Sequence, residues 1–263
     1  MRTLVVLGDS TSVGIGDPVT GGWRGFGPML GAAFPDYRNF SFAGARIGCV
    51  RTRQLPSALA ARPDAVVVLA GMNDTLRSDF DPVRLHHDLD HVVRALRAVG
   101  AAVVTVRFHD HSRVFRLPGA LRRALSGRVA ALNEVIDAVV ARHGIGCVDL
   151  DLLPGAYDQA TWSVDRLHPS ELGHRRLAAA FADVLGSAPV SLELTGGARV
   201  TPLHHAAWLV AKGLPWLWRR SRDLVPMVVR IVLAERVAEP IRSDRTHQAG
   251  LLSDGVEQTV TDR

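Results

Sequence analysis

Short runs of aliphatic and β-branched residues recur along the first 187 residues, and they constrain the fold more than any other feature of the sequence. The run Val66-Val67-Val68-Leu69 is apolar without interruption, which is typical of a strand buried on both faces of a sheet. Runs of this kind predict five strands, at Thr3–Leu7, Arg38–Phe42, Ala65–Ala70, Ala102–Arg107 and Gly146–Leu150.

Longer amphipathic segments separate these runs. In Pro82–Val99 the apolar residues recur at the spacing of one helix face, and Gly100 follows where a helix C-cap is expected. The other predicted helices are Pro28–Phe34, Val50–Ala61, Gly119–Arg142 and Glu171–Gly186. Strands that alternate with helices indicate an α/β fold, in which a parallel sheet lies between helical layers.

The chain divides into unequal parts. Its 263 residues are 47% hydrophobic and 22% charged, a composition that allows a sizeable buried core. Residues 1–187 are predicted to form one α/β domain, and 188–203, rich in Gly and Pro signals, a linker. An amphipathic, basic and aromatic helical extension is predicted at 204–240, followed by a disordered tail at 241–263.

The extension carries three of the five tryptophans, Trp208, Trp216 and Trp218. Within 204–230 five basic residues stand against one acid, a composition found in helices that lie on anionic membrane surfaces. Its uncharged runs are shorter than the roughly 20 apolar residues that span a bilayer. Two interpretations remain open for 204–235: peripheral membrane contact, or packing on the domain and self-association.

The remaining composition excludes several classes of protein. The net charge of +5 comes from scattered arginines, so we expect no nucleic-acid partner. The two cysteines, Cys49 and Cys147, imply no disulfide framework. The opening apolar run is too short for a secretory signal. We therefore expect a cytoplasmic protein, with membrane-peripheral placement as the alternative.

Four short segments carry the candidate functional groups. Three of them follow successive predicted strands: Gly8-Asp9-Ser10, Ala43-Gly44-Ala45 and Gly71-Met72-Asn73-Asp74. The fourth, Asp165-Arg166-Leu167-His168-Pro169, precedes the last helix of the domain. The carboxyl ends of parallel strands are where open α/β folds place their ligands, so these segments are expected to converge.

Together the segments supply what acyl transfer needs. A serine hydroxyl requires an adjacent base to become a good nucleophile, and Ser10 with His168 fits that requirement. Asp165 is placed to orient the imidazole and stabilise its charged form. Backbone N–H groups of Ser10 and Gly44, with the side-chain amide of Asn73, are expected to form the oxyanion hole.

These four segments resemble the sequence blocks of the SGNH (GDSL-type) serine hydrolase superfamily, over residues 1 to about 187. The resemblance implies a flavodoxin-like three-layer α/β/α sandwich with a five-stranded parallel sheet. It also implies hydrolysis of carboxylic esters, from small molecules or lipids, without a cofactor or metal. An acyltransferase with the same acyl-enzyme, or a non-catalytic binding protein, are the alternatives. Asp9 is interpreted as a structural neighbour of Ser10, and Asp74 as a cap or loop-bracing group.

Other residues near the site have less specific patterns. Trp23, in the Gly-rich loop after Ser10, either walls the substrate pocket or packs its loop on the domain. His109 follows the fourth predicted strand and is a candidate substrate contact. His87 and His91 have the spacing of a metal site, but a solvated helix face explains them better. His174 is the second candidate for the base.

Overall fold

The computed structural model describes residues 1–114 and 119–195. The predicted extension (204–240) and tail (241–263) lie outside these residues, as does the second part of the predicted linker (188–203). Within the described part of the chain, none of the helices combines the length and hydropathy needed to cross a bilayer.

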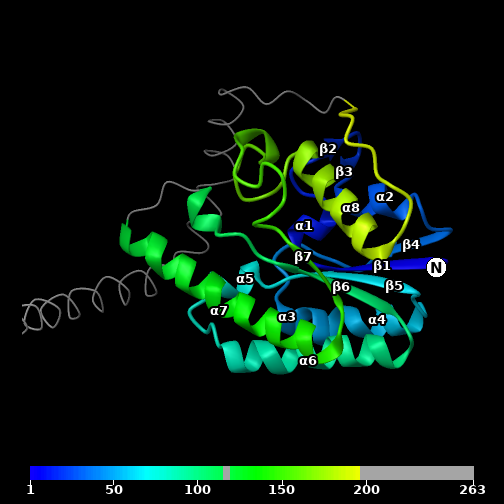
Figure 1. Ribbon diagram of the computed structural model, residues 1–263, viewed down its shortest axis with the longest axis horizontal. Coiled ribbons are helices and arrows are strands. Elements are labelled where there is room, and N and C mark those ends of the chain that lie inside the picture. Colours follow the sequence, from blue (N-terminus) through cyan, green and yellow to red (C-terminus); the bar gives the residue numbers. More distant parts are fainter. Residues whose placement is uncertain (115–118, 196–263) are drawn as a thin grey trace, which may run out of the picture.

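A five-stranded parallel sheet forms the centre of the fold, which confirms the strand pattern (Figure 1). The strand order is β4-β1-β5-β6-β7, so β1 (Thr3–Gly8) lies between β4 and β5. All residues of β5 are buried, which explains the uninterrupted apolar run in the sequence. The other strands are β4 (Asp36–Asn39), β5 (Ala65–Leu69), β6 (Ala102–Arg107) and β7 (Gly146–Asp149).

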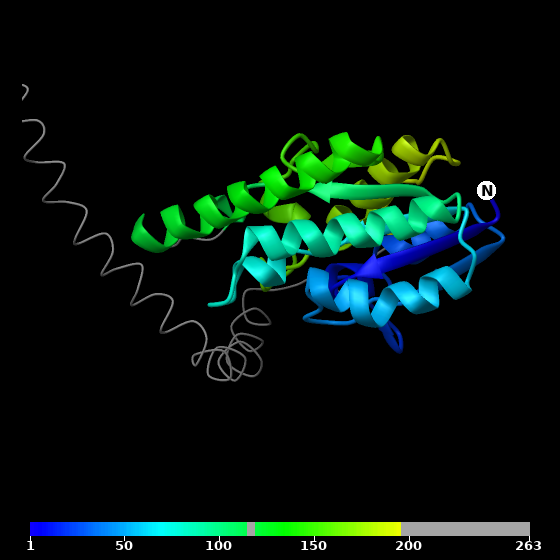
Figure 2. The same cartoon turned by 90° about the horizontal axis from the view of Figure 1, so that it is seen from below.

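Helices cover both faces of this sheet, so the three-layer sandwich is confirmed (Figure 1 and Figure 2). One layer pairs α2 (Phe26–Gly31) with α8 (Glu171–Leu185), and α6 (Pro82–Ala98) packs against α7 (Gly119–His143) in the other. The second layer also holds α3 (Ile47–Cys49), the π-helical turn η1 (Val50–Gln54) and α4 (Leu55–Ala60). The Asp81 side chain caps α6 by accepting from two backbone N–H groups.

Three predicted elements differ from the observed ones by two or more residues, and the first is α2, which runs from Phe26 to Gly31 and not from Pro28 to Phe34. The second strand, predicted at Arg38–Phe42, has its regular pairing from Asp36 to Asn39 instead. The segment after it stays beside β1, because Phe40 N donates to the Val6 carbonyl at 3.0 Å and Phe42 N to the Gly8 carbonyl at 3.4 Å. The helix predicted at Val50–Ala61 begins earlier, at Ile47, and includes the π-helical turn.

Several short elements were not predicted from the sequence, because they are too short to show a helix or strand periodicity. They are α1 (Ser10–Val13), the hairpin strands β2 (Pro18–Val19) and β3 (Gly22–Trp23), α5 (Met72–Thr75), and the 3₁₀ turns η2 (His111–Arg113) and η3 (Gln159–Thr161). All but one follow directly or closely on the carboxyl ends of β1, β5 and β6; η3 lies in the loop between β7 and α8.

The strand order creates a switch point at the carboxyl end of β1. From β1 the chain crosses first to β4 on one side and then to β5 on the other. Neighbouring connections therefore diverge there, and they leave a crevice in which open α/β sheets bind ligands. Ser10 lies two residues beyond the end of β1, at this point of the fold.

Candidate active site

Ser10 stands on a sharp strand-to-helix turn. Gly8 ends β1 with a φ of 153°, and a Cβ there would lie 2.1 Å from the Leu69 carbonyl oxygen, so only glycine fits. The Asp9 side chain then caps α1 by accepting from Thr11 N at 3.0 Å. The turn therefore places Ser10 as the first residue of a helix that starts at the edge of the sheet.

His168 and Asp165 lie beside this serine although they follow it by more than 150 positions. His168 Nε2 is 2.8 Å from Ser10 Oγ, and His168 Nδ1 is 2.6 Å from Asp165 Oδ2. The three side chains that sequence reasoning grouped thus form one continuous hydrogen-bonded series. Because the carboxylate accepts the Nδ1 proton, the Nε2 lone pair of the neutral imidazole faces the serine hydroxyl.

The segment that carries Asp165 and His168 is a tight loop closed at its base. Trp162 and Pro169 form an antiparallel bridge, and Ser163 N donates to the His168 carbonyl at 2.8 Å. Inside the loop Asp165 Oδ1 accepts from Ser163 Oγ, Leu167 N and His168 N. We call residues 162–169 the base loop. Its own backbone fixes the carboxylate that orients the imidazole.

The two carboxylates beside the Ser10–His168 pair have opposite pKa shifts. Burial alone would raise the pKa of Asp165, but hydrogen bonds from His168 and Ser163 lower it to about 2. Burial raises the pKa of Asp9 to about 6, against the hydrogen bond from Thr11 and the attraction of His168. Asp165 is therefore the carboxylate held ionised next to the imidazole.

The three donors predicted for the oxyanion hole lie on neighbouring segments, since the Asn73 amide contacts Asp9 and Ala45, which adjoin Ser10 and Gly44 in sequence. Neither the Ser10 N–H nor the Gly44 N–H has a hydrogen-bond partner among residues 1–114 and 119–195. Gly44 has a φ of 79°, and the space where a Cβ would stand is open. The Asn73 amide nitrogen is 3.3 Å from Asp9 Oδ2 and 3.2 Å from the Ala45 carbonyl oxygen. Two of the donors are free, and the third is held by weak contacts.

Asp74 braces the loops that carry two of these donors, in agreement with its structural interpretation. Its buried carboxylate accepts from Arg46 Nε at 3.0 Å and from Ile47 N at 3.1 Å. Arg46 also pairs with Asp79. Burial raises the pKa of Asp74, and the bonds from Arg46 and Ile47 oppose that rise. The segment after β4 is thereby tied to the segment after β5.

Gln54 is a site residue that the sequence did not reveal. Its buried side-chain amide accepts from Gly8 N and donates to Gly8 O, both at 2.8 Å. At this level the regular pairing of β4 has ended, and the Gln54 amide pairs with the last residue of β1, whose carbonyl also accepts from Phe42 N at 3.4 Å. The π-helical turn that ends at Gln54 carries the side chain to this position. No local pattern connects two residues 46 positions apart.

The other sequence candidates lie in several places. Trp23 is 46% exposed on β3, and it is not one of the residues that line the cavity described below. His174 is fully buried, its Nε2 is 3.0 Å from the Ile15 carbonyl oxygen, and burial lowers its pKa to about 4, so it acts as a core residue. Among the described residues, no group of three metal-ligating side chains is assembled, and this includes His87 and His91.

His109 is buried in an aromatic cluster beside the base loop. His109 Nε2 lies 2.8 Å from His111 Nδ1, and the Trp162 ring is 4.9 Å from the His109 ring. Burial lowers the pKa of His109 to about 4 and that of His111 to about 3, so both rings are neutral at pH 7. A hydrogen bond links His111 to the Arg166 backbone, and the cluster therefore touches the base loop from β6.

Comparisons with known proteins agree on the kind of domain. A family model described as the GDSL-like Lipase/Acylhydrolase family matches residues 6–176. The crystal structure of TesA is 25% identical, with a TM-score of 0.55, over 70% of this chain and 98% of TesA. No curated protein matches the chain.

Two further solved structures share the fold. LAE5, an alpha/beta hydrolase enzyme from the metagenome of Lake Arreo, Spain, is 21% identical with a TM-score of 0.57, over 70% of this chain and 95% of LAE5. A catalytic mutant of Axe2, an acetylxylan esterase from Geobacillus stearothermophilus, is 16% identical with a TM-score of 0.57, over 74% of this chain and 97% of Axe2. At these identities the likeness extends to the fold alone.

Proposed function

The chain belongs to the GDSL-like lipase/acylhydrolase family, and from that premise we propose that it hydrolyses carboxylic esters through an acyl-Ser10 intermediate. The observation that carries the proposal is the series from Ser10 Oγ through His168 to Asp165, with spacings of 2.8 and 2.6 Å. Those are hydrogen-bond distances, and they support proton transfer without rearrangement of the side chains.

In the acylation half, Ser10 Oγ attacks the ester carbonyl carbon while His168 Nε2 takes the hydroxyl proton. The carbonyl oxygen becomes an oxyanion, which the free N–H groups of Ser10 and Gly44 stabilise together with the Asn73 amide. Collapse of the tetrahedral intermediate breaks the bond to the alcohol oxygen, and His168 returns its proton to that oxygen. The alcohol leaves, and the acyl group remains on Ser10.

In the deacylation half, water takes the place of the alcohol. His168 removes a proton from the water, whose oxygen attacks the acyl carbon, and the same donors hold the second oxyanion. Collapse releases the carboxylic acid and returns the proton to Ser10 Oγ. Asp165, with its pKa lowered to about 2, stays ionised throughout and stabilises the imidazolium in both halves.

The test is replacement of the nucleophile. Ser10→Ala is expected to abolish hydrolysis of p-nitrophenyl acetate and labelling by a fluorophosphonate, while Ser57→Ala, at an exposed position on α4, keeps both. Full activity in Ser10→Ala would overturn the proposal. Transfer of the acyl group to an added alcohol in preference to water would reassign the protein as an acyltransferase that uses the same intermediate.

A further inference from the structure

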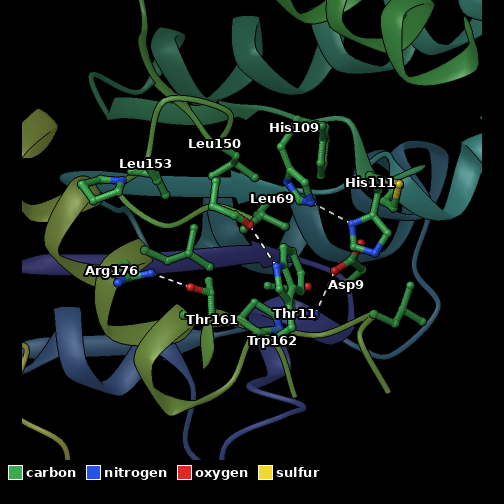
Figure 3. A pocket seen from close by; sticks show the side chains of 18 residues that line it. Asp9, Thr11, Leu69, His109, His111, Leu150, Leu153, Thr161, Trp162 and Arg176 are labelled. Carbon is green, nitrogen blue, oxygen red and sulfur yellow. Dashed lines mark hydrogen bonds between the residues drawn. The ribbon is translucent and has the colours of Figure 1, made fainter. Parts of the chain in front are cut away.

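A cavity of about 70 Å³ lies between the sheet and the loop that follows β7 (Figure 3). Its partly exposed rim includes Thr11, Met72 and Leu167, and its depth reaches the buried Leu150 and Leu177. Protein interiors are close-packed, so a void of this size beside a site is a feature to explain.

The cavity lies beside Ser10 and His168, although neither residue lines it. It is lined by Asp9 and Thr11, the two neighbours of Ser10, and by Leu167 and Pro169, the two neighbours of His168. A chain attached to Ser10 Oγ would have to pass between Thr11 and Leu167 to enter the cavity. Pockets at the carboxyl ends of parallel strands are the usual ligand sites of this kind of fold.

The chemistry of the walls selects the ligand. Apolar side chains, five of them leucines, make up most of the lining, and several of its polar groups already have partners. Trp162 Nε1 donates to the Ala156 carbonyl at 2.9 Å, and Arg176 donates to the Gly155 carbonyl and the Thr161 hydroxyl (Figure 3). His109, which also lines the cavity, is neutral because burial lowers its pKa to about 4. A charged group would lose hydration against these largely apolar walls, whereas a hydrocarbon group loses nothing.

We propose that this cavity binds the acyl chain of the substrate ester and limits it to a short one. The proposal rests on the proposed function, because it concerns the group that Ser10 carries. An engineered cavity of about 150 Å³ accommodates benzene, and the present volume is about half of that. Acyl groups of roughly two to four carbons fit such a space, and longer chains do not.

Leu153 determines the size of the cavity in this interpretation. It is a partly buried lining residue that packs against the core, and it lies on a loop, where a change of side-chain volume is tolerated. The preceding residue, Leu152, is 79% exposed and does not line the cavity. The same substitution can therefore be made at Leu153, which lines the cavity, and at Leu152, which does not and serves as the matched control.

The experiment measures kcat/KM for p-nitrophenyl acetate, butyrate and octanoate in the full-length protein. The unaltered protein is expected to prefer butyrate over octanoate by at least about tenfold, because one excess methylene group in an apolar pocket already changes rates by about 10–200-fold. Leu153→Ala is expected to raise the octanoate-to-butyrate ratio about tenfold, and Leu153→Phe to lower the butyrate-to-acetate ratio by a similar factor. Leu152→Ala and Leu152→Phe are expected to leave both ratios unchanged.

Unchanged ratios in Leu153→Ala, or the same changes in the Leu152 variants, would overturn the acyl-chain proposal. Preference of the unaltered protein for octanoate would do so as well. Leu153→Ala is sufficient by itself if the phenylalanine variant does not fold, and fluorophosphonate labelling of Ser10 verifies that each variant has an intact site. Each of these outcomes leaves the acyl-Ser10 proposal standing, whereas activity in Ser10→Ala would overturn that proposal separately.

Discussion

The two carboxylates beside the Ser10–His168 pair differ in how the chain holds them. Asp165 has all its hydrogen-bond partners within the base loop, at Ser163, Leu167 and His168. Asp9 has one local partner, Thr11 N, and one 64 residues away, the Asn73 amide. One side of the site is therefore built from a single short loop, and the other from segments that only the folded sheet brings together.

The electrostatic result differs in the same way. The base loop supplies enough donors to lower the pKa of Asp165 to about 2 in spite of burial. The end of β1 supplies too few, and burial raises the pKa of Asp9 to about 6. Environments that separate the pKa values of two neighbouring acids assign them different roles. Asp165 is suited to be the charged partner of His168. Asp9 is suited to be a helix cap, because burial disfavours its ionised form.

The largest effect is expected from removal of the charge in the base loop. Asp165→Asn keeps the size of the side chain but favours the wrong tautomer of His168, so kcat is expected to fall by about 10³–10⁴-fold. Steady-state kinetics with p-nitrophenyl acetate measure the change in kcat. The control is Asp183→Asn, at an exposed position on α8. If kcat in Asp165→Asn fell less than tenfold, the base loop would not orient the imidazole.

The next effect tests the long-range side of the site. Asn73→Ala removes one predicted oxyanion donor, and kcat is expected to fall by about 10²–10³-fold with little change in KM. The same substitution removes a donor from Asp9, so the pKa of Asp9 is expected to rise further. A loss confined to KM would show instead that the Asn73 amide contacts the bound substrate and not the transition state.

Gln54→Met separates positioning from chemistry. The substitution leaves the buried Gly8 N–H without a partner and leaves the Gly8 carbonyl only the 3.4 Å contact from Phe42 N, which is expected to lower the free energy of unfolding by about 2 kcal/mol. The turn before Ser10 loses its support, so kcat is expected to fall about tenfold while KM stays constant. Denaturant unfolding and kinetics measure both effects, with Thr52→Ala, at an exposed position on the same π-helical turn, as the matched control. A stability loss with full kcat would make Gln54 a structural residue only.

The same contrast explains what the sequence could predict. The uninterrupted apolar runs of β1 and β5 predict strands because burial on both faces leaves a local sequence pattern. Asp165 and His168 are recognisable as a pair because they are only three positions apart. Gln54 was missed because its partner, Gly8, is distant in sequence, and no residue near Gln54 indicates the contact. Trp162 was missed for a related reason: its role as a cavity wall depends on residues from four separate segments.

The smallest effect is a dependence of stability on pH that has opposite signs for the two carboxylates. The pKa of Asp9 rises from 3.8 to about 6 on folding, so the folded protein binds the proton more tightly. Stability from Asp9 is thus present below pH 4 and lost as the pH rises through 6, by about 2–3 kcal/mol. The pKa of Asp165 falls to about 2, so its contribution is present above pH 4 and lost as the pH falls through 2.

Asp9→Asn removes the first dependence and leaves the second. Any constant cost of the substitution cancels when each protein is compared with itself, so the stability of Asp9→Asn relative to the unaltered protein is expected to increase by about 2–3 kcal/mol between pH 4 and pH 8. Denaturant unfolding at both pH values measures that difference. If the stability difference between the two proteins were the same at pH 4 and pH 8, folding would not raise the pKa of Asp9. The distant donors of Asp9 would then stabilise its carboxylate as effectively as the local donors of Asp165 do.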